Sequence, residues 1–405
     1  MITNYYANIV SLIYSILSDG RFKSLKGCRK KFIAAALGCF SSLKGKKNFL
    51  NFGRFTGQRE QYFRANFEQK FNFQAFNTKM VARQGIQKCA IAFDPSFIPK
   101  SGKKTYGLGP YWSGCAKKAK RGLEICGFAA IDVGLRTAFH LNAIQTPPLE
   151  NTTLLDHYCQ IVKVNYLYFK ELSNYLVADA YFSKKPMVDA IRSLGMHFIS
   201  RLRNDASLQY LYQGAYSGKG RPKTYAGKVN VKQPDMNFFR LILSTEELKI
   251  YNATVYYNAF KQKINLSIAV FYSKEGKEVA RKLYGATDLE MDGVEAVNFY
   301  RARFQIEFRY RDAKQHCGLN GCQARSKNKL DFHFNAALTT VNLAKVQRLK
   351  NRKSEREPFS MANYKTQCNN MLMLELFIRR FAINPNTRKN QKIINERCDY
   401  GLIAA

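Results

Sequence analysis

The chain has few acidic residues for its length. Only 29 of its 405 residues are Asp or Glu, against 65 Lys and Arg, so its formal net charge is +36. A charge of this size repels itself unless a polyanion neutralises it, which indicates nucleic acid or an anionic membrane as the partner. Hydrophobic residues nevertheless make up 46% of the sequence, which excludes a disordered basic protein and allows two or three folded domains.

The sequence also lacks the features of secreted and membrane proteins. Residues 1–20 have no basic segment followed by a small-residue cleavage site, so we do not interpret them as a signal peptide. The apolar run within residues 31–45 is too short to span a bilayer. We therefore expect nucleic acid, and no membrane, as the partner.

Cysteine and histidine patterns that bind metal are missing as well. The ten cysteines include no CxxC pair, and without a secretion signal they predict reduced thiols in a cytoplasm. One group of neighbouring residues has no common zinc spacing, so we interpret its members as ordinary buried or surface residues: His316, Cys317, Cys322 and His333.

Residues 1–85 are predicted to form a helical N-terminal DNA-binding region. Gly57 lies between two short segments with helical periodicity, which is typical of a helix-turn-helix. The second helix would carry the following polar side chains: Arg59, Gln61 and Arg64. A plain helical bundle with a solvated basic face is the alternative, and the overall charge favours DNA binding.

From residue 88 the sequence changes to short apolar runs. Residues 88–94 predict a strand that ends at Asp94, because Pro95 follows, and residues 175–182 predict another that carries Asp179. With the intervening segments they give three antiparallel strands, a helix, a strand, a helix and a strand. This is the order of an α/β fold with a ribonuclease H-like mixed sheet, predicted here for residues 86–350.

Two further regions complete the expected organisation. Residues 204–284 contain β-branched and aromatic runs parted by polar turns, which predict an all-β insertion. A possible capping box at residues 287–290 and the helix-stopping Gly318 predict one long helix over residues 289–317. Residues 351–405 are predicted to form a C-terminal helical segment and a basic tail.

The long predicted helix has an unusual charge distribution. At about 100° per residue, Tyr300, Arg303, Glu307 and Lys314 share one stripe about 60° wide, with apolar residues on both sides. The opposite side, expected to face solvent, carries Arg301, Gln305, Arg309 and Asp312. An ion pair with an arginine one turn away would by itself account for Glu307 in a buried arc.

Two aspartates suggest a different explanation for Glu307. Asp94 and Asp179 each end an apolar strand, and the proposed fold makes these strands neighbours with both carboxylates at one end. Adding Glu307 creates three converging carboxylates, which would repel one another unless they bound a divalent metal. Hard oxygen ligands favour Mg²⁺ or Mn²⁺, so we expect these three residues to bind two such ions.

These residues resemble a known family. Tyr300, Arg303, Glu307 and Lys314 have the Y-x2-R-x3-E-x6-K spacing of bacterial insertion-sequence DDE transposases, in the group named for its Tyr-Arg-Glu-Lys signature. Asp94 and Asp179 resemble the first and second catalytic aspartates of that family, and the resemblance covers roughly residues 85–350. Ala180 departs from the glycine that often follows the second aspartate.

The resemblance implies an enzyme whose partner is double-stranded DNA, both the ends of a mobile element and the target. It would cleave the ends, free a 3′-OH and join it to target DNA. It implies a homodimer in the synaptic complex and a location in the bacterial cytoplasm at the nucleoid. Cleavage through a DNA hairpin is one route in such enzymes. The single tryptophan, Trp112, lies outside the insertion, so another residue would have to stack on a flipped base in that route.

The expected DNA contacts fall into two sets. Tyr300, Arg303 and Lys314 would follow successive phosphates near the cleaved end. Looser candidates for phosphate contacts are Lys103, Lys104, Lys219, Arg221 and Lys223, together with Arg59 and Arg64 of the N-terminal region. Two other functions stay open: a ribonuclease H-like nuclease without strand transfer, and a non-catalytic DNA-binding protein of the same fold.

Overall fold

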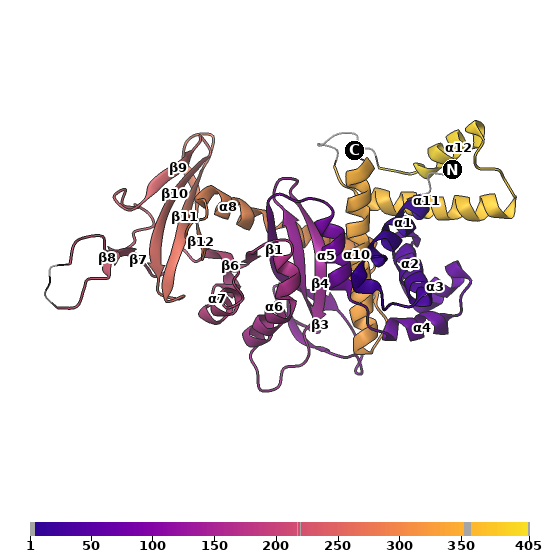
Figure 1. Cartoon of the computed structure of the whole chain (residues 1–405), viewed down its shortest axis with the longest axis horizontal. Coiled ribbons are helices and arrows are strands. Elements are labelled where there is room, and N and C mark those ends of the chain that lie inside the picture. The colour runs from indigo at the N-terminus through magenta and orange to yellow at the C-terminus, as the bar shows by residue number, and fades with distance from the viewer. Residues whose placement is uncertain (1–4, 217, 219, 352–357, 404–405) are drawn as a thin grey trace.

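The computed structural model describes residues 5–216, 218, 220–351 and 358–403. The molecule is elongated, with a helical region at one end, a β-rich extension at the other and a mixed sheet between them (Figure 1). Its first and last described helices, α1 (Tyr5–Leu17) and α12 (Arg388–Cys398), both lie in the helical region.

The central sheet has the predicted ribonuclease H-like order. The strands β1 (Cys89–Pro99), β3 (Lys118–Asp132) and β4 (Thr137–Gln145) are antiparallel. Strand β5 (Tyr175–Ala178) pairs parallel with β1, and β6 (His197–Leu202) pairs parallel with β5. Their connections are the helices α6 (Leu154–Lys170) and α7 (Lys185–Arg192). A short strand that the sequence did not predict, β2 (Gly109–Ser113), pairs with the start of β3.

The sequence predicted that strand β1 ends at Asp94, and this prediction is wrong. The strand continues to Pro99, and Asp94 pairs with Gly127 of β3. Strand β5 pairs with β1 only as far as Phe93, so the following part of β1 has a free edge on that side. Because a proline donates no backbone hydrogen bond, Pro95 is tolerated where one edge of the strand is unpaired.

The predicted all-β insertion is confirmed, and it extends the central sheet. Its strands are β7 (Leu208–Leu211), β8 (Tyr225–Lys228), β9 (Arg240–Ser244), β10 (Leu248–Tyr257), β11 (Gln262–Tyr272) and β12 (Glu278–Ala286). Strand β12 pairs antiparallel with β6, so the described strands form one 12-stranded sheet. The insertion is therefore anchored directly to the strand that follows α7.

The single long helix predicted over residues 289–317 is wrong. Two helices occupy this region, α8 (Gly293–Ala302) and α9 (Gln305–His316), with a break at Arg303 and Phe304. The Asp292 side chain caps α8 by accepting from the Glu295 N–H at 2.9 Å. Across the break, backbone N–H groups bond to carbonyls three residues earlier, which is the tighter 3₁₀ pattern. The predicted stop at Gly318 is confirmed by its left-handed φ of 72°.

Helix α10 (Lys327–Asn351) closes the free edge of β4 with side chains. Asn342 accepts from the His140 N–H at 2.6 Å and donates to the His140 carbonyl at 2.7 Å. Asn335 makes the same pair of bonds to Ala143, at 2.9 and 3.0 Å. An unpaired strand edge needs such partners, so these buried amides stand in for a neighbouring strand.

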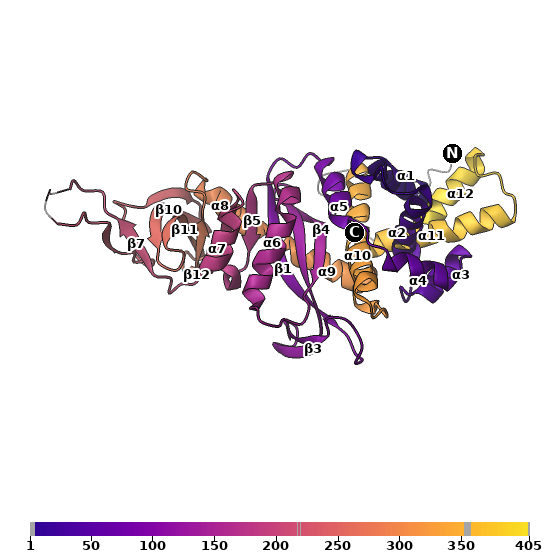
Figure 2. The same cartoon turned by 60° about the horizontal axis from the view of Figure 1, so that its bottom comes forward.

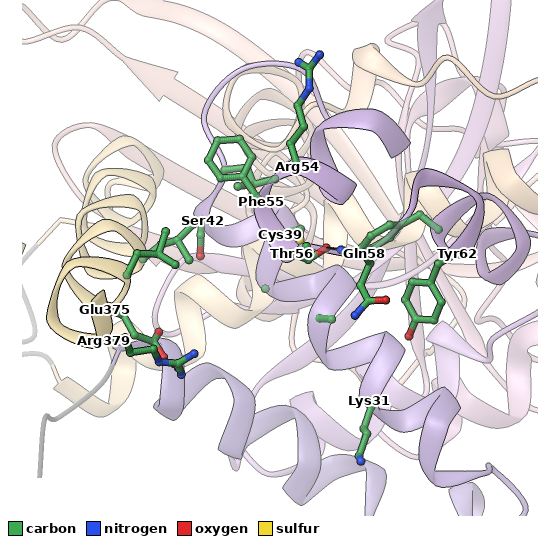
Figure 3. Close-up of a pocket in the computed structure, with 17 residues that line it drawn as sticks. Lys31, Cys39, Ser42, Arg54, Phe55, Thr56, Gln58, Tyr62, Glu375 and Arg379 are labelled. Carbon is green, nitrogen blue, oxygen red and sulfur yellow. Dashed lines mark hydrogen bonds and ion pairs between the residues drawn. The ribbon is translucent and has the colours of Figure 1, made fainter. Parts of the chain in front are cut away.

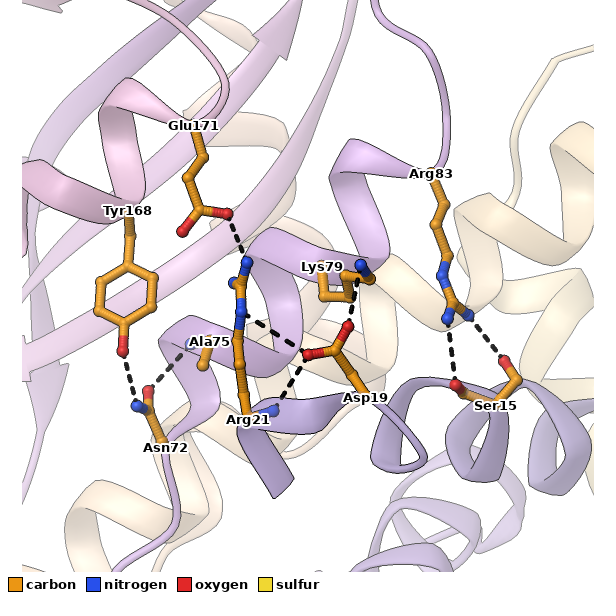
Figure 4. A network of polar contacts seen from close by, with 9 residues as sticks. All are labelled: Ser15, Asp19, Arg21, Asn72, Ala75, Lys79, Arg83, Tyr168 and Glu171. Atoms are coloured by element: carbon orange, nitrogen blue, oxygen red, sulfur yellow. Dashed lines mark hydrogen bonds and ion pairs between the residues drawn. The ribbon is translucent and has the colours of Figure 1, made fainter. Parts of the chain in front are cut away.

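The N-terminal helices pack around α10, and the last of them also contacts β4. They are α1, α2 (Gly27–Ser42), α3 (Phe49–Thr56), α4 (Glu60–Glu68) and α5 (Phe73–Ala82). Phe67 of α4 lies 4.3 Å from Phe332 of α10 between ring centroids, and one hydrophobic cluster continues from these helices into the sheet. Polar contacts add to this packing, including Arg21 to Glu171 at 2.8 Å (Figure 4).

The C-terminal helix α11 (Met361–Arg380) is attached by a buried lysine. Lys365 donates to the carbonyls of Phe40 and Leu43, at 2.6 and 2.9 Å, and so satisfies carbonyls at the end of α2. Within the described part of the chain, no helix combines the length and the apolar character needed to cross a membrane.

We predict that Lys365 makes stability depend on pH. Burial, followed by the nearby Lys47 ammonium, lowers the pKa of Lys365 to about 7, from 10.5 in an unfolded chain. Between these two values the unfolded chain binds a proton that the folded chain does not, so the free energy of unfolding should rise with pH. Urea unfolding from about pH 7 to about pH 9.5 should show a smaller rise for Lys365→Met than for the wild type.

Lys274→Met removes an exposed lysine and provides the control, which should retain the wild-type rise. An equal rise in the free energy of unfolding with pH in the wild type and in Lys365→Met would contradict titration of the buried Lys365.

Candidate active site

The pleat of β1 separates the core from the site. Phe93 packs with its ring centroid 5.0 Å from that of Phe128, and Phe128 packs against Phe169 of α6. The next residue, Asp94, therefore points to the opposite face, where α9 lies (Figure 2). On that face α9 presents Glu307 in its first turn.

Asp179 reaches the same site from the end of β5. It caps the short 3₁₀ helix of residues 180–182, accepting from the Ala180 N–H at 2.7 Å. Its other contact is with α8, where the Tyr300 hydroxyl donates to Asp179 Oδ1 at 3.1 Å. The structure thus brings the second aspartate against the helix pair that carries Arg303 and Glu307.

Arg303 lies between two of the carboxylates. Its Nη1 is 3.4 Å from Asp94 Oδ1, and its Nη2 is 3.3 Å from Glu307 Oε1. Only 11% of the Arg303 side chain is exposed, against 22% of Asp94 and 42% of Glu307, so the arginine is shielded while Glu307 is open to solvent. The ion pair to Glu307 that the sequence allowed is therefore present, and it extends to Asp94.

The electrostatics of Asp94 reflect this crowding. Its pKa is raised to about 7, chiefly by burial, and the carboxylates of Glu307 and Asp179 raise it further. Arg303 acts in the opposite direction and lowers it. Three acidic groups thus influence one another here, and a cation among them offsets part of their repulsion.

Tyr310 of α9 supports Asp94 from beneath. The Tyr310 hydroxyl donates to the Asp94 backbone carbonyl at 2.8 Å. It lies above Gly127, where an added Cβ would come within 2.0 Å of the hydroxyl oxygen. Glycine at the position opposite Asp94 therefore leaves the space that Tyr310 fills.

Arg309 was predicted on the solvent side of the helix, and this prediction is wrong. It is fully buried, donating to the Phe128 carbonyl at 3.0 Å and to His140 Nδ1 at 2.8 Å. The pKa of His140 is lowered well below its usual value, chiefly by burial and then by Arg309, so this ring is a neutral acceptor. The error lies in which arc was taken as buried. Helix α9 buries Ile306, Arg309, Tyr310 and Ala313, so Glu307 lies at the edge of the buried face and not at its centre.

Lys314 lies on the same face as Glu307, two turns further along α9. Its ammonium donates to Ser96 Oγ at 2.9 Å and to the Phe97 carbonyl at 3.0 Å. Tyr300 thus contacts Asp179, Arg303 contacts Asp94 and Glu307, and Lys314 contacts the later part of β1. The sequence predicted that these four residues face one way, but on one helix instead of two.

The predicted turn between α3 and α4 is confirmed. Gly57 ends α3 with a left-handed φ of 71°, and Arg59 is the exposed residue before α4. The turn borders a hollow of about 740 Å³ between α2 and α11, in which Glu375 pairs with Arg379 (Figure 3). Arg64 is exposed but pairs with Glu60 at 2.7 Å. DNA contacts by Arg59 and Arg64 stay predictions.

The remaining predicted basic residues lie away from the carboxylates. Lys103 and Lys104 are exposed in the loop after β1, and Arg221 and Lys223 are exposed before β8. Lys219 lies outside the described residues. Trp112 is on β2, 64% exposed and outside the insertion.

The donor chemistry of the three carboxylates fits a hard divalent cation such as Mg²⁺ or Mn²⁺. Their present placement is stabilised by Arg303. Across the residues that the structure describes, no set of three His, Cys, Asp or Glu side chains is grouped closely enough to hold a metal. Of the residues that the sequence analysis set aside as a zinc site, His333 bonds to the Gly318 carbonyl at 2.9 Å.

Comparison with known proteins agrees with the site. The sequence profile of the transposase DDE domain matches residues 86–343, which is well over half of the chain. This span contains all three carboxylates and the helices α8 and α9. No curated protein matches the chain. Members of this family act on DNA and in general use divalent metal ions. The chain belongs to the transposase DDE-domain family.

Proposed function

We propose that this protein is the transposase of a bacterial insertion sequence. It would bind the ends of the element, cleave DNA to free a 3′-OH and join that end to target DNA. The observation that supports this proposal best is the grouping of Asp94, Asp179 and Glu307 around Arg303 and Tyr300. A protein that only binds DNA gains nothing from three acids placed beside a phosphate backbone.

Asp94, Asp179 and Glu307 are the residues that would hold two Mg²⁺ ions, or Mn²⁺ in their place. Bound there, the ions would supply Lewis-acid stabilisation of the charge on the attacking and leaving oxygens. Carboxylates suit this role because they provide hard oxygen donors on three separate elements.

The cleavage step transfers a phosphoryl group. The oxygen of a water molecule forms a bond to phosphorus as the bond to the 3′-oxygen breaks, leaving a 5′-phosphate and a 3′-OH. In the joining step this 3′-OH attacks a target phosphodiester, and a target 3′-oxygen leaves and takes up a proton. His140 is not available as a base, since both of its ring nitrogens are engaged, by Arg309 and by Asn335 at 3.0 Å.

Tyr300, Arg303 and Lys314 would position the DNA strand. The distance from Glu307 to Lys314 along α9 is about 10 Å, which corresponds to about three nucleotides of a strand. Each of the three residues now bonds to protein atoms, so DNA binding would exchange those partners for phosphate oxygens. Joining two ends requires two sites, which supports a homodimer in the synaptic complex.

We predict that each carboxylate is needed for cleavage. Asp94→Asn, Asp179→Asn and Glu307→Gln keep the side-chain shape but remove the charge, so each should slow Mg²⁺-dependent cleavage roughly 100-fold or more. The substrate is a duplex taken from the DNA that flanks the coding sequence. Asp205→Asn, at an exposed aspartate outside the site, should cleave like the wild type. Wild-type cleavage by any of the three variants would remove that residue from the proposed site.

We also predict that Lys314 contributes one phosphate contact. Lys314→Ala should lower the slope of log affinity against log salt by about one unit in a DNA-binding titration. Lys314→Arg retains the charge and should keep the slope, which separates the contact from the support that Lys314 gives to β1. An unchanged slope in Lys314→Ala would exclude the contact.

A further inference from the structure

A strongly basic hollow of about 730 Å³ lies beyond the end of β1. Three segments form its walls: Lys46 between α2 and α3, residues 99–105 after β1, and residues 320–325 between α9 and α10. Its cationic side chains are Lys46, Lys100, Lys103, Lys104 and Arg325, and its lining includes no Asp or Glu. Positive charge is therefore gathered here without an acidic partner in the walls.

The walls of this hollow are fastened to one another. The Lys100 ammonium donates to the carbonyls of Cys322 and Ala324. The Tyr106 N–H donates to the Arg325 carbonyl at 2.9 Å. These bonds tie the loop after β1 to the segment before α10. Four cations are thereby left exposed on a formed surface: Lys46, Lys103, Lys104 and Arg325.

A neighbouring hollow leads to α3 and α4, the helices of the predicted helix-turn-helix. It has a volume of about 600 Å³, shares Gln323 and Arg325 with the basic hollow, and is also lined by Asn48 and Arg64. Its basic residues are largely paired, because Arg64 binds Glu60 at 2.7 Å and Lys329 binds Glu68 at 2.9 Å. The unpaired charge is thus concentrated in the first hollow.

The basic hollow is in line with the carboxylates along β1. From Asp94 the strand passes Ser96 and Phe97, which bond to Lys314, and reaches the hollow at Pro99. Five residues of strand span about 17 Å. At about 3.4 Å per nucleotide, this distance corresponds to about five nucleotides of one DNA strand.

The lining also indicates which part of a nucleic acid would lie there. No aromatic side chain lines the basic hollow, so it offers no surface on which a base could stack. Lysine and arginine side chains without stacking partners are typical of contacts to phosphate.

We propose that Lys46, Lys103, Lys104 and Arg325 bind the DNA phosphate backbone about five nucleotides from the bond cleaved at the carboxylates. This contact links the active site to the helix-turn-helix, so one duplex touches both. The inference rests on the proposed function for the identity of that duplex. Lys46 and Arg325 were not recognised in the sequence as DNA contacts.

The first test measures how binding depends on salt. Fluorescence anisotropy with a duplex of about 30 base pairs should give a slope of log affinity against log salt that falls by about three units in Lys103→Ala/Lys104→Ala/Arg325→Ala. The matched control is Lys163→Ala/Lys170→Ala/Lys274→Ala, which removes three exposed lysines elsewhere and should keep the wild-type slope. Equal slopes in the two triple variants would overturn the proposal.

The second test locates the contact. In the wild type, ethylation of phosphates about five nucleotides from the cleaved bond should weaken binding of the flanking duplex, and in the triple variant it should not. Interference that persists unchanged in the triple variant would overturn the proposal. A different result would also overturn the proposal: inorganic phosphate alone protects the wild type against heat, while the triple variant keeps the wild-type slope of log affinity against log salt. That combination indicates a small-anion site. Loss of cleavage with both binding results intact would count against the proposed function and not against this contact.

Discussion

The structure of the site depends on bringing three carboxylates near one another in a partly buried place, although they are not grouped closely enough to hold a metal. Arg303 meets this requirement by lying between Asp94 and Glu307, and Tyr300 does the same for Asp179 through its hydroxyl. Tyr300 lies in the last turn of α8, and Arg303 lies at the break between α8 and α9. Beneath them, the buried Arg309 and Tyr310 fix the backbone of β1 and β3 at Asp94 and Phe128. Acids that would otherwise repel one another are thus held by cations and hydroxyls of residues 300–310, which span the end of α8 and the start of α9.

Much of this arrangement could be predicted from local sequence signals. Two apolar runs that each end in an aspartate predicted Asp94 and Asp179 on neighbouring strands. The helical spacing of Tyr300, Arg303, Glu307 and Lys314 predicted that Glu307 faces the same way as the other three. The helix break could not be predicted, because residues 300–307 contain no glycine or proline to mark it. Arg309 was assigned to solvent because a charged side chain is rarely fully buried, although it is buried against His140. The extension of β1 past Pro95 depends on the unpaired edge beside β5, which only the assembled sheet reveals.

The net charge of +36 is a poor guide to which cations meet DNA. Lys345 and Lys365 are buried and bond to backbone carbonyls, so they hold helices in place. Arg21 and Arg64 pair with acids on the surface. The basic hollow collects its cations from three segments that are distant in sequence. For this reason the sequence predicted Lys103 and Lys104 as DNA contacts but not Lys46 and Arg325. Lysine and arginine thus serve three purposes here: they hold buried helix ends, they pair with surface acids, and in the basic hollow they are available to DNA. Burial and the nearest partner of each side chain distinguish the three.

The most direct test of the central claim is an assay for joined products. The wild-type protein would be incubated with Mg²⁺, a labelled duplex from the DNA flanking its coding sequence, and a supercoiled plasmid as target. A transposase should yield labelled 3′ ends covalently joined to plasmid DNA, and a duplex that already ends at the cleaved bond should lose joining when its terminal nucleotide is 3′-deoxy. Cleavage of the duplex without any joined product would contradict the account and identify the protein as a nuclease of the same fold.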